Sequence, residues 1–347
     1  MKPTSSPTPS ADRRDGSSAD GRPGGHGPSG IDLPSIIARA SSGAVLSSLE
    51  AEEAFHRIME GDATHAQMTE LLVALRDRGA APGEVAGGVR ALRRAMIPVR
   101  SDAPDELVDT CGTGGGTTTT FNISTAAAFV AAGAGVRVAK HGNRSFSSRS
   151  GSADVLEALG VRIELEPAEM ERALAEAGIV FMFAPLLHPA MRHIGPVRRE
   201  LGGATIMNLL GPLTNPASAR RQVVGVSDPA FVPLIVEALR ELGHTRALVV
   251  HGAPGLDELS PLGETRVAEL VDGEVRETTV TPEALGVEPC TAEAIGGGSP
   301  AENAQVILEV LRGEARGGPR SAVLLNAGAA IHVAGLAESL REGVALA

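Results

Sequence analysis

The stretch Asp109-Thr-Cys-Gly-Thr-Gly-Gly-Gly-Thr-Thr-Thr-Thr-Phe-Asn-Ile-Ser-Thr125 is the most informative part of this sequence. It follows the apolar pair Leu107-Val108 and leads into the alanine-rich run 126–132, so the predicted order is strand, glycine loop, helix. Glycines let a backbone come close to an anion, and a helix beginning near Ser124 directs free N–H groups and a positive dipole end at the loop. Lys140 adds a full charge. The pattern predicts a phosphate-binding loop.

The loop does not follow the common nucleotide-binding signatures. The pattern G-x-x-x-x-G-K-[ST] is absent, and G-x-G-x-x-G fits only if the threonines are ignored. A P-loop NTPase is therefore disfavoured. A run rich in glycine and threonine can also be a flexible connector, but a run between a predicted strand and a predicted helix favours a binding loop.

The remainder of the chain after residue 104 alternates short apolar segments with helical patterns. Predicted strands cover 136–139, 179–183, 222–226 and 247–250, and predicted helices include 153–159 and 232–242. This alternation predicts an α/β fold with a mostly parallel central sheet. The segments 266–270 and 275–280 are separated by Asp272-Gly273, which predicts an antiparallel hairpin with a tight turn.

The N-terminal third divides into two parts. Residues 2–30 contain no Val, Leu, Ile, Met or Phe, so we expect a disordered tail over about 1–32. Residues 33–103 predict a small helical domain, because Ser47-x-x-Glu50 and Thr64-x-x-Gln67 are capping-box patterns before apolar stripes of helical spacing.

Composition restricts the function. The 347 residues include 31 basic and 42 acidic ones, for a net charge of −11, which argues against a broad nucleic-acid or anionic-membrane surface. No apolar run approaches the roughly 18 residues that span a bilayer, and the N-terminus lacks the apolar core of a secretory signal. We expect a cytoplasmic protein that holds an anionic substrate by local charge.

The two cysteines, Cys111 and Cys290, are too few for a disulfide framework, and we expect free thiols. Cys111 lies beside the glycine loop, where a crosslink would hinder access of a ligand. A nucleophilic role is conceivable for it, but a small packing residue is the favoured interpretation.

Several motifs together resemble the anthranilate phosphoribosyltransferase family of tryptophan biosynthesis. They are GTGG, FNIST, KHGNR and GSADVLEALG, followed by 183–191 (FAPLLHPAM), 196–201 (PVRREL), 208–216 (NLLGPLTNP), 250–252 (VHG) with 255–258 (GLDE), and 302–304 (ENA), so that the resemblance covers about residues 45 to 347. It implies the nucleoside phosphorylase and phosphoribosyltransferase fold, with the α/β domain at 104–196 and 215–347. It also implies that about 197–214 completes the helical domain, that the active cleft lies between the domains, and that the protein is a homodimer joined through the helical domain.

The implied reaction transfers the phosphoribosyl group of phosphoribosyl pyrophosphate to the amine of anthranilate, releases pyrophosphate and depends on Mg²⁺. By the resemblance, phosphoribosyl pyrophosphate contacts fall on Gly112, Gly115, Gly116, Thr120, Asn122, Ser124, Thr125, Lys140, Ser148 and Ser152, with His141 and Arg144 in the same loop. Asn143 and Arg198 match anthranilate contacts, and His188 lines the route of the acceptor; Arg199 is a competing neighbour of Arg198. The implied catalytic residues are Lys140, Asn143 and Arg198. Of two implied Mg²⁺ ions per subunit, Ser124 and Glu258 hold one, and Asp257 and Glu258 hold the other.

The chain departs from the family pattern in one informative place. The family's loop usually continues GTGGD with a further glycine, whereas this chain has Gly116 and then Thr117. The chain also ends at Ala347 within a predicted helix that we expect to run further in relatives. A pyrimidine nucleoside phosphorylase and a relative that binds nucleic acid without catalysis remain as alternatives, although the charge of −11 disfavours the second.

Overall fold

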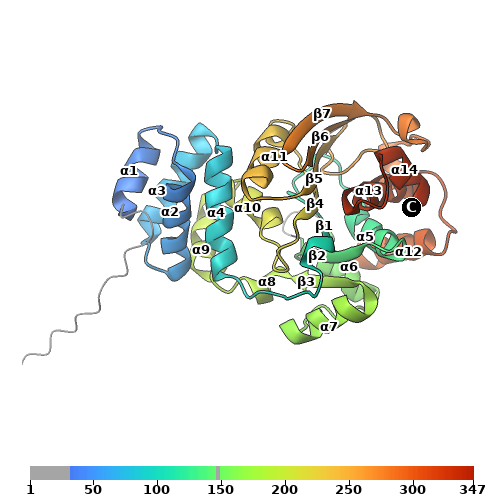
Figure 1. Cartoon of the computed structure of the whole chain (residues 1–347), viewed down its shortest axis with the longest axis horizontal. Coiled ribbons are helices and arrows are strands. Elements are labelled where there is room, and N and C mark those ends of the chain that lie inside the picture. The colour runs from blue at the N-terminus through green and yellow to red at the C-terminus, as the bar shows by residue number, and fades with distance from the viewer. Residues whose placement is uncertain (1–31, 146–148) are drawn as a thin grey trace, which may run out of the picture.

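The structure, a computed structural model, describes residues 32–145 and 149–347. The molecule is elongated, with a group of helices at one end and a sheet flanked by helices at the other (Figure 1). Of the predicted N-terminal tail, residues 1–31 lie outside the described part of the chain. Asp32 caps the first helix, where its side chain accepts a hydrogen bond from the Ser35 backbone N–H at 2.8 Å.

Four helices form the first group, namely α1 (Leu33–Ser41), α2 (Ser48–Glu60), α3 (His65–Arg78) and α4 (Pro82–Ala95). Both predicted capping boxes are present, at Ser47 with Glu50 and at Thr64 with Gln67. Helices α2 and α4 approach closely at Gly87, where an added Cβ would lie 2.3 Å from the Ser48 carbonyl oxygen. Glycine is therefore needed at this crossing.

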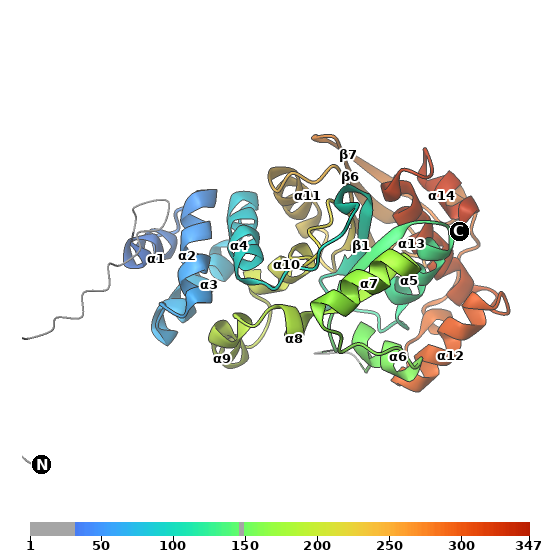
Figure 2. The ribbon, with the colours of Figure 1, turned by 60° about the horizontal axis from the view of Figure 1, so that its bottom comes forward.

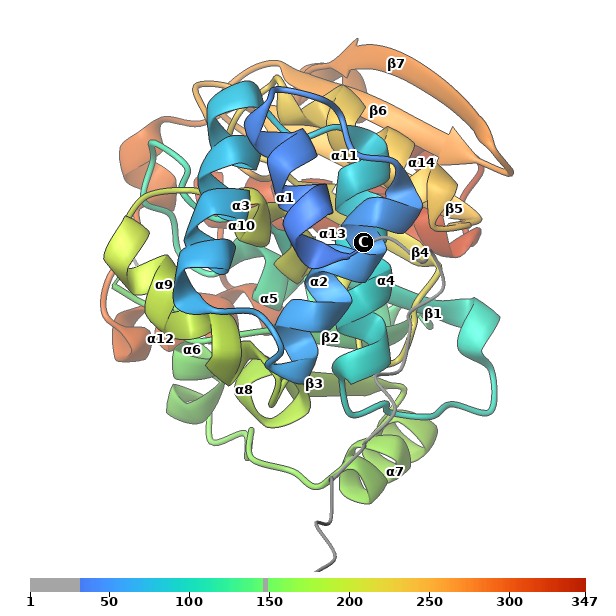
Figure 3. The same ribbon diagram turned by 90° about the vertical axis from the view of Figure 1, so that its left-hand side faces the viewer.

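Two later helices return to this group. Helices α9 (Met191–Leu201) and α10 (Ile206–Leu213) bury Ile194, Val197 and Leu210 in the same apolar core as Leu71 and Leu72 of α3. Viewed from the helical end, α9 lies beside α3 (Figure 3). Segments separated by more than 100 positions thus share one core.

The second region is built on a seven-stranded sheet with strand order β3-β2-β1-β4-β5-β6-β7. The strands are β1 (Leu107–Gly112), β2 (Arg137–Gly142), β3 (Ile179–Phe183), β4 (Arg221–Gly225), β5 (Arg246–Gly252), β6 (Thr265–Val271) and β7 (Glu274–Val280). The first five are parallel, and β6 and β7 are antiparallel, which confirms the predicted fold class. The predicted hairpin turn is present, with positive φ at Asp272 (47°) and Gly273 (90°) as a tight hairpin turn requires.

Alternate residues of the strands face different cores. Val223 of β4 faces the core made with α13 (Gly318–Ala334), whereas Val224 faces the core shared with α11 (Phe231–Glu241) and the helical group. The remaining elements are η1 (Pro104–Glu106), α5 (Ile123–Gly133), α6 (Ser152–Ala158), α7 (Pro167–Ala177), α8 (Ala184–Leu187), η2 (Glu283–Leu285), η3 (Ala292–Ile295), α12 (Pro300–Leu311) and α14 (Leu340–Leu346). Figure 2 shows α5, α6 and α12 close together beside the sheet. In the part of the chain that the structure describes, no helix is both long and apolar enough to cross a membrane.

Candidate active site

Several of the predicted site residues gather where β1 and β2 end. These strands are parallel neighbours, so Gly112 and the segment Lys140–Gly142 lie at the same edge of the sheet. The loop that follows β5 packs against this edge, and an added Cβ on Gly112 would lie 2.4 Å from Asp257 Oδ2. The described part of the site therefore combines groups from 110–125, 140–145, 149–152 and 252–258.

Lys140 is a buried cation at the centre of this group, with a residue exposure of 3%. Its Nζ donates to the Thr110 backbone oxygen and lies 3.3 Å from Ser124 Oγ. Two predicted site residues from separate strand–helix units are thus brought into contact. Thr125 Oγ1 in turn donates to Ser152 Oγ at 3.2 Å, which joins the start of α5 to the start of α6.

The glycine loop is held against the acidic loop by backbone contacts. Gly114 and Gly115 adopt positive φ values of 67° and 80°, and the Gly114 N–H donates to Asp257 Oδ2 at 2.9 Å. An added Cβ on Gly116 would lie 2.9 Å from the Gly255 carbonyl oxygen, and this oxygen accepts from the Thr117 N–H at 3.2 Å. The departure from the family pattern at position 116 thus coincides with a close approach of two backbones.

The two acidic residues differ in their surroundings. Burial raises the pKa of Asp257, which the bond from Gly114 opposes. Burial and then the charge of Asp257 raise the pKa of Glu258 to about 8, which Lys140 and the Ser124 backbone N–H oppose. The backbone N–H of Ser124 therefore lies close to the Glu258 carboxylate.

The donor set fits a hard divalent cation. No group of three or more His, Cys, Asp or Glu side chains suited to a metal occurs among the described residues. Two carboxylates and the Ser124 hydroxyl suit Mg²⁺, which takes few protein ligands and completes its shell with water and phosphate oxygens.

Asn122 belongs to a network that ties three loops together. Its Nδ2 donates to the Ser150 backbone oxygen at 3.0 Å, and its Oδ1 accepts from Ser150 Oγ at 3.1 Å and from Asn303 Nδ2 at 2.9 Å. Thr120 forms a β-bridge with Gly296. Thr120 thus contacts the segment before α12, and Asn122 contacts the first turn of that helix.

In the segment after β2, Asn143 and Arg144 are bound to their own loop and to α6. Asn143 Oδ1 accepts from the Arg144 N–H at 2.7 Å, so its amide oxygen is bound to its own loop. Arg144 pairs with Asp154 at 2.9 Å and with Glu157, and its guanidinium lies 5.4 Å from the Phe183 ring centroid. The charge of Arg144 is directed at α6, where these acids raise its pKa. Ser148 lies outside the described residues.

Arg198 lies on α9, on the helical side of the molecule. It is half-buried, burial lowers the pKa of its guanidinium, and no carboxylate of the described part of the chain pairs with it. Its neighbour Arg199 is exposed. A half-buried and unpaired arginine is suited to receive a carboxylate, because its planar fork can bind both oxygens.

A buried carboxylate that sequence reasoning missed anchors the strand edge. Asp109 is fully buried and accepts from the His141 N–H at 3.1 Å and from Asn215 Nδ2 at 2.8 Å. Burial raises its pKa to about 6. Its position three residues before the first glycine of the loop was the available signal. Cys111 beside it has its pKa raised by burial, which disfavours the thiolate and any nucleophilic role.

The acidic loop has a second support that the sequence did not indicate. Asn326 of α13 accepts from the Leu259 N–H at 2.9 Å and donates to the Leu259 oxygen at 3.0 Å. Both backbone groups that follow Glu258 are thereby fixed. The two partners are 67 positions apart, so no local pattern links them.

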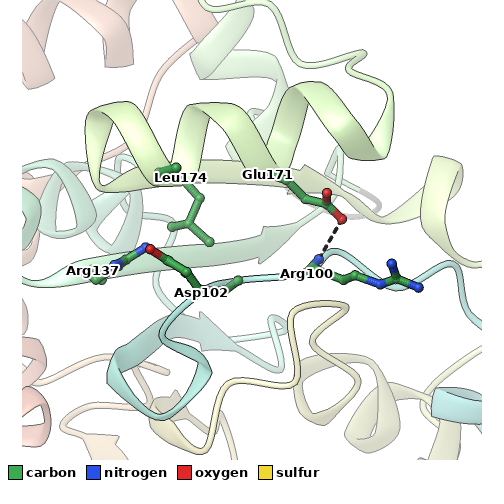
Figure 4. Close-up of a pocket in the computed structure, with 7 residues that line it drawn as sticks. Arg100, Asp102, Arg137, Glu171 and Leu174 are labelled. Carbon is green, nitrogen blue, oxygen red and sulfur yellow. Dashed lines mark hydrogen bonds and ion pairs between the residues drawn. The ribbon is translucent and has the colours of Figure 1, made fainter.

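A separate cavity of about 260 Å³ lies at the other end of β2, near Arg137 (Figure 4). Its lining is Arg100, Ser101, Asp102, Arg137, Glu171, Leu174 and Ala175. Arg137 pairs with Asp102 at 2.6 Å, and Glu171 accepts from the Arg100 backbone N–H at 2.9 Å. Because Lys140 occupies the opposite end of the strand, this cavity is distinct from the candidate site.

The fold and this arrangement of groups match a known class of transferase. Residues 34–96 match the helical bundle domain of the glycosyl transferase family, and residues 104–347 match its a/b domain. Anthranilate phosphoribosyltransferase from Rubrobacter xylanophilus is 53% identical over 315 residues, which cover 91% of this chain and 92% of the relative. The chain belongs to the anthranilate phosphoribosyltransferase family.

Solved structures agree with this membership. The crystal structure of anthranilate phosphoribosyltransferase from Thermus thermophilus is 48% identical, with a TM-score of 0.85 over 90% of this chain and 92% of that one. The Saccharomyces cerevisiae enzyme in complex with phosphoribosyl pyrophosphate and Mg is 26% identical, with a TM-score of 0.81 over 90% and 92%. A further structure of the yeast enzyme, with a TM-score of 0.79 at 25% identity over 90% and 91%, contains 4-fluoroanthranilate.

Proposed function

We propose that this protein transfers the phosphoribosyl group from phosphoribosyl pyrophosphate to the amine of anthranilate and releases pyrophosphate. The observation that carries this proposal is the convergence of the glycine loop, Lys140 and the pair Asp257 and Glu258 at one edge of the sheet. Relatives that share half of the sequence bear the same name, which supports the substrate pair. The reaction is a step of tryptophan biosynthesis.

The glycine loop and Lys140 bind the diphosphate. The backbone N–H groups of Gly115 and Gly116 and of the first turn of α5 supply hydrogen bonds that need no reorganisation during the reaction, and Lys140 stabilises the oxygens of the departing pyrophosphate. Bound Mg²⁺ supplies charge neutralisation on the leaving group. Ser124 with Glu258, and Asp257 with Glu258, are the residues that would hold two ions per subunit.

The protein residues near the acceptor orient anthranilate for the reaction. Arg198 pairs with the anthranilate carboxylate, and Asn143 and His188 position the ring so that the amine faces the anomeric carbon. The amine displaces pyrophosphate directly, with inversion at the anomeric carbon and without a covalent enzyme intermediate. An aromatic amine is neutral at pH 7, so the reaction needs no strong base.

The remaining contacts divide between binding and support. We assign Gly112, Gly115, Gly116, Thr120, Asn122, Thr125, His141, Arg144, Ser148 and Ser152 to the phosphoribosyl pyrophosphate site. Contacts of Asn122 with Ser150 and of Thr125 with Ser152 support this assignment, since they join the loops that carry these residues. The ion pairs of Arg144 with α6 favour a role in holding its loop.

We further propose that about 197–214 completes the helical domain of 33–103, and that two copies associate through this domain in the cytoplasm. The shared core of α9 and α10 with α3 supports the first part. Exposed Val45 and Leu49, at 56% and 59%, lie on the helical domain and support the second. The two free cysteines are consistent with a reducing compartment.

Product analysis tests the proposal. The protein is incubated with Mg²⁺, phosphoribosyl pyrophosphate and anthranilate, and pyrophosphate release is measured beside the mass of the organic product. We expect one pyrophosphate for each phosphoribosyl-anthranilate formed. A protein that instead cleaves a pyrimidine nucleoside with inorganic phosphate, and leaves phosphoribosyl pyrophosphate intact, would be a nucleoside phosphorylase.

A further inference from the structure

Asn303, the second residue of the sequence motif Glu302-Asn-Ala304, has no place in the reaction described above. It lies in the first turn of α12 with a residue exposure of 2%. Its Nδ2 donates to Asn122 Oδ1 at 2.9 Å, and its Oδ1 accepts from the Gly298 N–H at 2.7 Å. The amide therefore connects the start of α5 with the segment that leads into α12.

Capping of helix α12 does not require the Asn303 side chain. Ser299 and Glu302 already form a complete capping box at the start of the helix. Asn303 directs its donor at a residue 181 positions away in the sequence. Because a buried amide without partners is costly, a core position would ordinarily carry an apolar residue unless the bond had a use.

The segment before α12 also contacts the threonine-rich loop directly. The Gly297 N–H donates to the Thr119 oxygen at 3.1 Å, and the Phe121 N–H donates to the Ile295 oxygen at 3.1 Å. An added Cβ on Gly297 would lie 2.2 Å from the Thr120 oxygen, so only glycine fits. Residues 295–298 thus pack along residues 119–121, and Asn303 holds the end of this segment through its bond with Gly298.

Asn122 connects Asn303 to a third segment, the loop before α6. It bonds both the backbone oxygen and the hydroxyl of Ser150, two residues before Ser152. Asn122 itself lies two residues before Ser124, which contacts Lys140. A loss of the Asn303 bond would therefore disturb the two helix starts that face the diphosphate site from different directions.

We infer that Asn303 is a positioning residue for phosphoribosyl pyrophosphate: it holds Asn122, and through it the starts of α5 and α6, in the geometry that binds the diphosphate. The inference rests on the proposed function. It adds that helix α12, which contributes no proposed substrate contact, sets the affinity for one of the two substrates.

The test compares Asn303→Ala with Ile307→Val. Ile307 is a fully buried residue of the same helix, and its shortening weakens the packing of α12 without touching the amide network. Steady-state kinetics give kcat and both KM values, and calorimetry gives the Kd for Mg²⁺–pyrophosphate, which reports on the diphosphate site even if no turnover occurs. Turnover by the parent protein establishes separately that the proposed function holds.

We expect Asn303→Ala to raise KM for phosphoribosyl pyrophosphate and Kd for Mg²⁺–pyrophosphate about tenfold, because the diphosphate site loses one buried hydrogen bond that holds its loops in place. KM for anthranilate stays within about twofold. Ile307→Val lowers the melting temperature but leaves both constants within about twofold of the parent.

Asn303→Asp covers the case in which the alanine variant fails to fold. It keeps the size of the side chain and the acceptor for Gly298, but it places a carboxylate oxygen opposite Asn122 Oδ1. We expect the same rise in Kd for Mg²⁺–pyrophosphate. Unchanged Kd in a folded Asn303 variant, or an equal rise for Ile307→Val, would show that Asn303 acts only on stability.

Discussion

His141 and His188 face each other with their Nε2 atoms 3.1 Å apart and their ring centroids 5.0 Å apart. Such a contact requires one ring nitrogen to donate and the other to accept, so at least one imidazole must be neutral. Burial lowers the pKa of His141 to about 3 and that of His188 to about 4. Both rings are therefore neutral at pH 7 and line the site without adding charge.

This pair makes stability depend on pH. In the unfolded chain these histidines bind protons below their ordinary pKa of 6.5, whereas in the folded chain they do not until pH 4 to 3. The folded state is thus most favoured above pH 6.5 and loses stability as pH falls. The free energy of unfolding of the parent, measured by urea denaturation, should fall as the pH is lowered from 6.5 to 4.5. We expect His188→Gln to reduce the slope of this free energy against pH by about 1 kcal/mol per pH unit. Parallel pH profiles would contradict the buried neutral pair.

Arg198 provides a prediction about the acceptor. Arg198→Ala should raise KM for anthranilate by 10- to 100-fold, because a lost bidentate carboxylate contact costs about 1.5–3 kcal/mol. Arg198→Lys should rescue only part of this loss, since an ammonium lacks the planar fork. The exposed neighbour in Arg199→Ala is the matched control and should leave KM nearly unchanged. A variant that binds anthranilate normally but fails with phosphoribosyl pyrophosphate would refute the assignment.

The acidic pair should respond unequally to neutralisation. Glu258→Gln is expected to reduce turnover more than Asp257→Asn, because Glu258 belongs to both proposed ion sites. Asparagine at 257 also keeps an oxygen that can accept from the Gly114 N–H. EDTA should abolish the activity of the parent, and added Mg²⁺ should restore it. Parental activity of both variants at limiting Mg²⁺ would exclude the proposed ligands.

Gly116 allows the effect of a missing acid to be separated from that of space. Any side chain at 116 meets the Gly255 carbonyl oxygen, so Gly116→Ala should raise KM for phosphoribosyl pyrophosphate by a steric effect alone. Gly116→Asp has the same steric effect and also introduces a carboxylate. The difference between the two variants in a Mg²⁺ titration therefore measures the charge, and we expect Gly116→Asp to shift the midpoint several-fold. Identical titrations would show that position 116 is only a turn residue.

The local elements of the fold were predictable because their signals are local. The capping box at Ser47 and Glu50 and the hairpin at Asp272-Gly273 each depend on residues at most a few positions apart. The strand, loop and helix around Gly112 were predictable for the same reason. Helix α1 lies within the helical domain predicted from residue 33, but its nine residues carry only a short apolar pattern after a long polar segment, so its bounds were not predictable.

The supports of the site were not predictable, because they join distant parts of the chain. Asp109 binds Asn215 across 106 positions, and Asn303 binds Asn122 across 181. A buried asparagine has the same appearance in a sequence whether it caps a helix or holds a loop. The ion pairs of Arg144 with α6 were likewise invisible, although the resemblance had indicated its loop.

The central claim is tested most directly by anthranilate fluorescence. The protein has no Trp and no Tyr, so it contributes almost no background to this measurement. With Mg²⁺ and phosphoribosyl pyrophosphate present, we predict a continuous loss of anthranilate fluorescence that stops when either substrate is omitted or EDTA is added. Stable fluorescence in the complete mixture, from protein that binds both substrates, would contradict the account.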